Sequence, residues 1–163
     1  YLLTPATVCL AIPLYEQLAE LKKNFVAIIA GIVSGTLTSL TVILVLSILF
    51  HLNHQQYVTL LPKSITTAIG MGVSEELGGI VTITVAVIVV TGVLGNVIAD
   101  LVCKLFRITD PVAKGVGIGT ASHAIGTARA LEMGQVEGAM SSLSIAVAGL
   151  LTVVGASIYS MFL

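Results

Sequence analysis

Charged residues are scarce in this chain: Asp, Glu, Lys and Arg make up 9% of its 163 residues, whereas soluble globular domains average about 25%. Hydrophobic residues make up 56%, which favours a lipid bilayer over water as the surroundings. The formal net charge of −1 lacks the basic footprint that nucleic-acid binding requires. Cys9 and Cys103 lack the CxxC spacing of a zinc or redox site and are interpreted as packing residues. The composition predicts one all-α integral membrane domain over residues 1–163.

The chain starts at Tyr1, with neither an initiator Met nor the basic n-region of a secretory signal peptide. We therefore expect it to begin inside a longer protein or at an alternative start.

Windows without charged residues locate the membrane spans, because a bilayer core about 30 Å thick requires roughly 20 apolar residues of helix. Three stretches meet this condition: residues 25–50, 77–99 and 138–163. The second is rich in Val, Ile and Thr, which form helix in a membrane because backbone groups must be satisfied within the segment. We predict three full transmembrane helices, with a polar loop at residues 51–56 after the first.

Shorter segments that Gly or Pro interrupts lie at residues 5–20, 62–76 and 111–132, and each begins with Pro. They share an Ala-Ile core at residues 11–13, 68–70 and 124–126, and one or two glutamates follow in every copy. We interpret them as broken or re-entrant helical segments that alternate with the spans in approximate repeats, over residues 1–52, 58–107 and 111–163. Chance matches among such common residues are the alternative. If each copy crosses the bilayer an odd number of times, neighbouring copies are inverted, as in many transporters.

Two pairs of basic residues bear on the path of the chain. Lys22 and Lys23 precede the first span, and Lys104 and Arg107 follow the second. If residues 64–76 dip into the membrane and return, both pairs lie on the cytoplasmic side, as the positive-inside rule requires. If the segment crosses fully, they lie on opposite sides. The rule therefore favours a re-entrant hairpin.

The segment at residues 111–132 holds the most informative polar set. Its glycines at residues 115–119 lack the GxxxxGK[ST] pattern of a nucleotide-binding loop, and we expect them to loosen the chain before a half-helix that starts near Ser122. The free N–H groups of such an N-terminus attract an anion. His123 and Thr127 are expected on one face, with Ser122 and Arg129 on an adjacent one. Guanidinium, imidazole and hydroxyl groups together predict binding of a small hydroxy- or keto-carboxylate.

Other interpretations of these residues stay open. Arg129 could instead pair with Glu132 at i,i+3 or anchor the segment end, and His123 could be a buried packing residue. Catalysis by Ser122 and His123 is not expected, because neighbours on a helix point about 100° apart and no third residue orients them.

The segment at residues 62–76 supplies a second hydroxyl-rich stretch. Ser64, Thr66 and Thr67 follow Pro62, and we expect them to line the substrate site opposite the half-helix. The alternative is that these hydroxyls bond only to their own backbone.

Three glutamates near segment ends are candidates for proton or cation coupling: Glu75, Glu76 and Glu132. Their end positions favour ordinary solvation as the alternative. No cluster of His, Cys and carboxylate residues has metal-site spacing, so neither a metal nor another cofactor is expected.

Four stretches resemble the signatures of a known family: Leu-Thr-Pro-Ala-Thr-Val at residues 3–8, Ala-Ile-Pro-Leu-Tyr at 11–15, Leu-Pro-Lys-Ser-Ile-Thr-Thr at 61–67 and Thr-Ala-Ser-His-Ala-Ile-Gly-Thr-Ala-Arg-Ala-Leu-Glu at 120–132. The chain is similar to the LrgB/CidB family over essentially its whole length. It departs from the family at residues 68–71, Ala-Ile-Gly-Met, where relatives usually read Pro-Ile-Ala-Met. It is also shorter, because members normally have further N-terminal membrane helices. The resemblance implies the C-terminal part of a member or a short form.

The resemblance also implies a function. Family members are multi-pass proteins of the bacterial inner membrane, paired with a small holin-like partner of the LrgA/CidA type and linked to murein hydrolase export, autolysis and programmed cell death. Plant relatives in the chloroplast envelope exchange glycolate and glycerate, and bacterial relatives have been connected with pyruvate uptake. We expect this chain to control lysis through transport of such carboxylates.

The competing hypothesis is an oligomeric holin- or antiholin-like pore component with no specific substrate. Helix faces rich in Gly and Ala favour a homodimer or higher oligomer in either case. Because no convincing catalytic constellation is found, an enzyme is not expected.

Overall fold

The computed structural model describes Ile12 and residues 15–163, and in this part of the chain the regular structure is all helical, as predicted. The helices are α2 (Leu18–Lys23), α3 (Phe25–Leu49), α4 (His54–Leu60), α5 (Thr67–Glu76), α6 (Val81–Leu105), α7 (Pro111–Met133) and α8 (Gln135–Tyr159), followed by the 3-10 helix η1 (Ser160–Phe162). Cys9, the family signature at residues 3–8 and most of the predicted broken segment at residues 5–20 lie outside the described residues.

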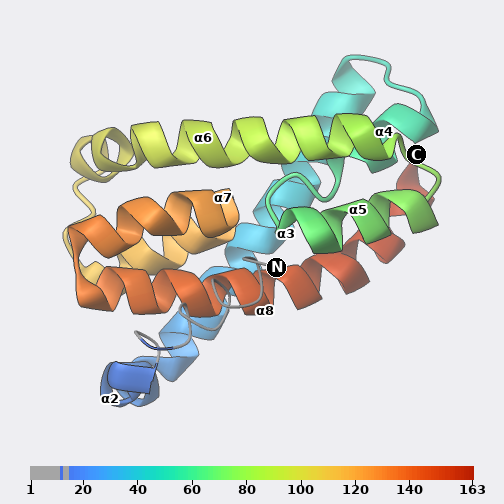
Figure 1. The fold of residues 1–163 in the computed structure, drawn as a ribbon. Coiled ribbons are helices and arrows are strands. Elements are labelled where there is room, and N and C mark those ends of the chain that lie inside the picture. Colours follow the sequence, from blue (N-terminus) through green and yellow to red (C-terminus); the bar gives the residue numbers. More distant parts are fainter. Residues whose placement is uncertain (1–11, 13–14) are drawn as a thin grey trace, which may run out of the picture.

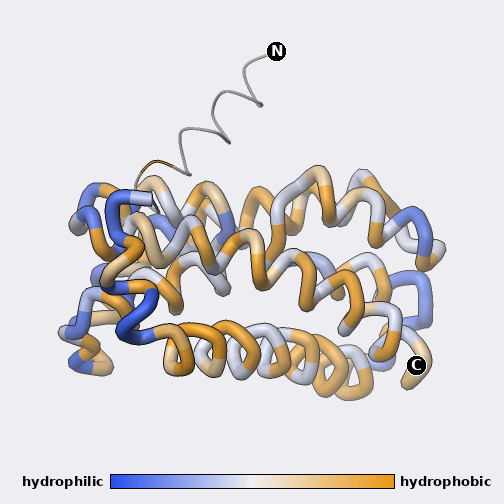
Figure 2. The backbone as a smooth tube through the Cα atoms, turned by 90° about the horizontal axis from the view of Figure 1, so that it is seen from below, coloured by the Kyte–Doolittle hydropathy of each residue, from blue (hydrophilic) through white to orange (hydrophobic). Residues whose placement is uncertain are grey.

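Three helices are long and apolar enough to cross a membrane: α3, α6 and the continuous stretch of α8 and η1. They confirm the three spans predicted from charge-free windows. In Figure 1, α6 and α8 run along the length of the bundle and α3 crosses it obliquely. Figure 2 shows hydrophilic residues gathered at the two ends of the bundle, with a mostly apolar stretch between them. The helix α6 continues six residues beyond the predicted limit of residue 99, because backbone hydrogen bonding carries on past the charged Asp100 and Lys104.

The helices α4 and α5 form a helical hairpin, with residues 61–66 as its turn. The structure corrects the predicted loop at residues 51–56, because α4 already starts at His54. A capping box begins that helix: Asn53 Oδ1 accepts the Gln56 N–H at 2.9 Å, and Gln56 Oε1 accepts the Asn53 N–H at 3.0 Å. Figure 1 places the turn of this hairpin near the middle of the bundle.

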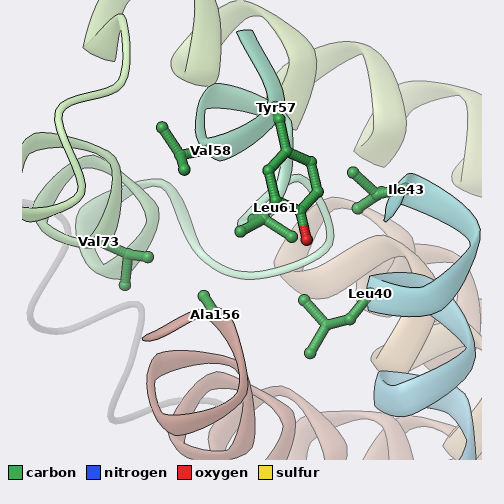
Figure 3. Close-up of a cluster of buried hydrophobic side chains, with 7 residues drawn as sticks. All are labelled: Leu40, Ile43, Tyr57, Val58, Leu61, Val73 and Ala156. Carbon is green, nitrogen blue, oxygen red and sulfur yellow. The ribbon is translucent and has the colours of Figure 1, made fainter. Parts of the chain in front are cut away.

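A buried apolar cluster fixes this hairpin against the long helices. Figure 3 shows its members, which are Leu40 and Ile43 from α3, Tyr57, Val58 and Leu61 from α4 and the adjoining turn, Val73 from α5 and Ala156 from α8. The phenol of Tyr57 is fully buried and donates to the Tyr159 carbonyl oxygen at 2.9 Å. The hairpin is therefore packed on both its arms.

The helix α7 is a second hairpin, because it breaks at His123, whose φ of 44° and ψ of −143° are not helical. Ile118 and Ala130, one from each arm, pack in one cluster with Ala99 of α6. The two arms lie side by side in Figure 1. The break lies near the middle of the bundle, where it faces the turn of the first hairpin.

The expectation that the glycines at residues 115–119 loosen the chain is wrong. Gly115 and Gly119 lie within regular helix and are buried against α8. A Cβ atom at Gly119 would lie 2.8 Å from the Ser141 Cα atom, closer than van der Waals contact allows. These glycines therefore serve close helix packing, and the chain reverses at His123 instead.

Side-chain neighbours show which loops share an end of the bundle. Lys23, Asp110 and Val136 line one cleft, which brings the starts of α3, α7 and α8 together with the loop after α6. At the opposite end the Thr59 hydroxyl accepts the Ile80 N–H at 2.8 Å, so α4 meets the start of α6. Six of the seven Lys and Arg residues belong to the first end, which we call the basic end: Lys22, Lys23, Lys104, Arg107, Lys114 and Arg129.

Candidate functional site

A pocket of about 300 Å³ lies where the first hairpin's turn meets α3 and the first arm of α7; we call it the central pocket. Its polar lining comes from Thr38 and Ser39 of α3, Lys63 and Ser64 of the turn, and Thr120 of α7. Gly31, Gly35 and Gly117 complete the wall with little bulk. Ser39 lies near the middle of α3, so the pocket is at mid-depth in the bundle.

Lys63 is the seventh cation of the chain and the one that lies away from the basic end. Its Nζ donates to Ser64 Oγ at 2.8 Å, and Ser64 Oγ lies 3.4 Å from Ser39 Oγ. Within residues 15–163 the ion pairs are those of Arg129, so Lys63 has no carboxylate partner there. A cation inside a membrane protein is costly and marks a functional site by default.

The donors available in the central pocket suit an anion. Thr38 and Thr120 donate their hydroxyl protons to carbonyl groups of their own helices, each at 2.7 Å. The ammonium of Lys63 has three protons, of which Ser64 uses one. Two N–H donors therefore remain, together with at least one proton from the Ser39 and Ser64 hydroxyls.

The break of α7 places its polar residues elsewhere. His123 is 2% exposed, and its Nε2 lies 3.0 Å from the Ile88 carbonyl oxygen of α6. Thr127 is fully buried; its hydroxyl donates to the His123 carbonyl oxygen at 2.9 Å and lies 2.7 Å from Ser141 Oγ of α8. The two side chains thus point to different helices, and neither lines the central pocket. Ser122 lines a neighbouring cleft between α6 and the first arm.

Arg129 lies at the basic end, bonded to Asp100 and Glu132. Its Nε donates to Asp100 Oδ2 at 2.8 Å, and its two terminal nitrogens pair with Asp100 and Glu132. The hydrogen bond to Asp100, followed by that to Glu132, raises the pKa of the Arg129 guanidinium above its ordinary value. The pair of Arg129 with Glu132 is the i,i+3 alternative that the sequence left open, and Asp100 of α6 is the second carboxylate partner of Arg129.

Four other predicted residues belong to the first hairpin itself. Thr66 is the N-cap of α5 without a side-chain capping bond, and Thr67 begins that helix. Both are half-buried, and neither lines the central pocket. Glu75 and Glu76 are exposed at the end of α5. Among residues 15–163 and Ile12, no three His, Cys, Asp or Glu side chains lie close enough to hold a metal ion.

Comparison with known proteins assigns the family. A model of the LrgB-like family matches residues 1–162 of the chain. This chain belongs to the LrgB-like family. Similar relatives are antiholin-like proteins LrgB from Bacillus mycoides (strain KBAB4), Bacillus cereus (strain B4264) and Bacillus anthracis (strain CDC 684 / NRRL 3495), each 39% identical over 163 residues. That alignment covers all of this chain and 71% of each relative. No solved structure matches the chain.

In this LrgB-like chain, Lys63 is the functional candidate that the sequence reasoning passed over. It lies inside the family-like run at residues 61–67, next to the predicted Ser64. A cation between Pro62 and a hydroxyl-rich stretch looks like part of a solvated loop when only hydropathy is considered. In the sequence Lys63 lies at the start of the predicted segment 62–76, much as Lys114 lies near the start of the segment 111–132, so the positions of the cations did not single it out.

Proposed function

We propose that this LrgB-like protein transports small hydroxy- or keto-carboxylates and binds them in the central pocket. The observation that carries the proposal is Lys63, a cation at mid-depth with no carboxylate partner within residues 15–163. A monoanionic substrate supplies the missing negative charge. Lys63 replaces Arg129 as the proposed binding cation, because the charge of Arg129 is already matched by Asp100 and Glu132.

The donor set supports this substrate class. Two N–H groups of Lys63 can bind the two carboxylate oxygens, and a hydroxyl of Ser39 or Ser64 can donate to an α-hydroxyl or keto oxygen. The volume of about 300 Å³ lies at the low end of ligand pockets, which run from about 300 to 1,000 Å³. Compounds of two or three carbons, such as glycolate, glycerate and pyruvate, suit such a volume.

The two hairpins support alternating access. We propose that both are re-entrant and that each follows a long helix in an inverted repeat, α3 with α4 and α5, then α6 with α7. Both long helices have 25 residues, and each is followed by a residue with a φ of 53°, His51 or Arg107. A side-chain cap from Asn53 or Asp110 then begins each hairpin. Inverted repeats with binding at the midplane are a common transporter design.

The setting in the cell follows from the family. Relatives carry the name antiholin-like protein, and we propose that this chain lies in a bacterial inner membrane with its basic end in the cytoplasm. There it controls murein hydrolase export, autolysis and cell death together with a holin-like partner of the LrgA/CidA type. In this proposal carboxylate transport is the primary activity and lysis control its consequence. A homodimer or higher oligomer stays a prediction.

Uptake by proteoliposomes tests the proposal. We expect saturable entry of labelled glycolate and pyruvate, without leakage of an enclosed dye. Lys63→Gln removes a charge-assisted hydrogen bond worth about 1.5–3 kcal/mol, so kcat/KM should fall at least about tenfold. Lys22→Gln, which removes a cation of the basic end, is the matched control and should transport normally. Arg129→Gln tests whether uptake requires a cation of the basic end instead of Lys63 in the central pocket.

The pore hypothesis predicts the opposite pattern. Dye leakage that is equal in the unmodified chain and in Lys63→Gln, without saturable uptake, would refute transport and support a holin- or antiholin-like pore. Saturable uptake that survives Lys63→Gln but is lost in Arg129→Gln would instead move the binding site to the basic end.

A further inference from the structure

A second pocket, of about 640 Å³, opens at the basic end between the end of α6 and the two arms of α7. We call it the basic pocket. Four of the seven Lys and Arg residues of the chain line it, from α6, the loop after it and the two arms of α7: Lys104, Arg107, Lys114 and Arg129. The proposed transport site does not include this pocket.

The charges of the basic pocket do not balance. Asp100 and Glu132 are the carboxylates of its lining, and Arg129 bonds to both. Within residues 15–163, Lys104, Arg107 and Lys114 have no carboxylate within ion-pair distance. Three cations around one space, with the nearby carboxylates occupied, leave a surplus of positive charge. A dianionic or monoanionic group with several oxygen atoms would match that surplus.

The end of α6 places Arg107 at the pocket. The Ile108 N–H donates to the Cys103 carbonyl oxygen at 2.8 Å and the Arg107 N–H to that of Lys104 at 3.2 Å, which is a Schellman motif. Arg107 occupies its left-handed position, with a φ of 53°, where Gly is usual.

The surroundings of the basic pocket are apolar as well as cationic. Leu101, Leu105 and Phe106 on the same end of α6 are 65%, 71% and 69% exposed, and Ile108 and Met133 contribute to the lining. Side chains of this kind face lipid tails where the hydrocarbon meets the headgroups. Basic pockets between helices at the cytoplasmic surface are suited to anionic headgroups.

We propose that the basic pocket binds a phosphate group, with Lys104, Arg107 and Lys114 as its ligands. The apolar surroundings favour the phosphate of an anionic phospholipid over a free phosphate. Arg129 offsets one of the two negative charges of Asp100 and Glu132, so the lining as a whole keeps a surplus of two positive charges for the phosphate.

Thermal unfolding of the purified chain in detergent tests this site. The probes are dihexanoyl phosphatidylglycerol, dihexanoyl phosphatidylcholine and inorganic phosphate, each titrated at constant ionic strength. A ligand that binds the folded chain raises the midpoint Tm with concentration. Arg107→Gln and Lys114→Gln should each weaken the phosphatidylglycerol response, with an apparent Kd about fivefold higher per cation removed. Lys22→Gln, outside the lining, is the matched control and should respond as the unmodified chain does.

The outcomes separate the sources of phosphate. A rise with phosphatidylglycerol that depends on Arg107 and Lys114 supports a lipid ligand, and an equally dependent rise with inorganic phosphate alone supports a soluble one. The proposal is overturned if the rise in Tm with phosphatidylglycerol is equal in Lys22→Gln and Lys114→Gln. It is also overturned if Tm rises with neither phosphatidylglycerol nor inorganic phosphate. Arg107→Lys keeps the charge and should retain the response, which separates loss of binding from a folding defect of Arg107→Gln.

Discussion

Thr84 of α6 ties the first hairpin to a membrane-spanning helix, and its removal should be measurably destabilising. The side chain is fully buried, and its Oγ1 lies 2.9 Å from the Thr59 carbonyl oxygen and 2.7 Å from Ser74 Oγ. The single hydroxyl proton of Thr84 is donated to the Thr59 carbonyl oxygen, and the Ser74 hydroxyl can donate its own proton to Thr84 Oγ1. Thr84→Val removes both hydrogen bonds and leaves the buried Ser74 hydroxyl without this partner.

The expected loss follows from this geometry. Hydrogen bonds between membrane helices are worth about 0.6 kcal/mol on average and up to about 1.7, so two of them give about 1–3 kcal/mol. Thr36→Val is the matched control, because the Thr36 hydroxyl of α3 is buried without a partner in the described part of the chain. Replacing that hydroxyl with a methyl group should be neutral or stabilising by up to about 1 kcal/mol.

The assay is unfolding of the purified protein by a denaturing detergent in mixed micelles, followed by circular dichroism. The free energy of unfolding should fall in Thr84→Val and hold or rise in Thr36→Val. Equal values for the two variants would refute the reasoning, because burial of a hydroxyl would then matter and its hydrogen bonds would not.

Three further predictions concern orientation, packing and capping. In intact cells, with the native cysteines replaced by serine, a cysteine at His54 should react with a membrane-impermeant maleimide and one at Lys104 should not, since we propose that the basic end faces the cytoplasm. The reverse labelling would invert the proposed orientation. Gly95→Ala should lower the thermal midpoint, because its Cβ would overlap Ser122 at the break of α7, whereas Gly72→Ala, with nothing within 4 Å, should be neutral or stabilising by about 0.5–1 kcal/mol. A midpoint that falls equally in both would show that close packing at Gly95 is unimportant. Asn53→Ala should cost about 0.5–2 kcal/mol of unfolding free energy through loss of the α4 cap, and Asn53→Asp, which keeps a capping oxygen, should recover most of it.

Hydropathy was sufficient to find the long helices, because the need to satisfy backbone groups in lipid leaves helix as the choice for any long apolar stretch. Hydropathy predicted the ends of these helices poorly. The window rule stopped the second span at residue 99 because Asp100 is charged, yet α6 continues to Leu105 and Asp100 pairs with Arg129 of α7. That partner is 29 residues away, and a local pattern carries no information about it.

The candidate site was predictable in residue type but not in position. Ser64 does line the central pocket, whereas the side chains of His123 and Thr127 diverge toward α6 and α8. The expectation that they share a face assumed that the half-helix starting near Ser122 includes His123. The left-handed φ of His123 breaks that assumption, and nothing in the residue type predicts such a conformation.

The position of Lys63 has opposite effects on membrane insertion and on the proposed binding of an anion. In the proposed orientation the six cations of the basic end stay among cytoplasmic headgroups while the protein is made, whereas Lys63, in the central pocket, is carried to mid-depth. On insertion scales a cation at the centre of a membrane helix costs about 2.5–3.5 kcal/mol. Lys63 lies in the turn of a hairpin, where one serine hydroxyl is its hydrogen-bond partner. A neutral residue at this position would ease membrane insertion and abolish the match to an anion. Variants selected only for better expression would therefore tend to lose Lys63 first, and with it the activity proposed here.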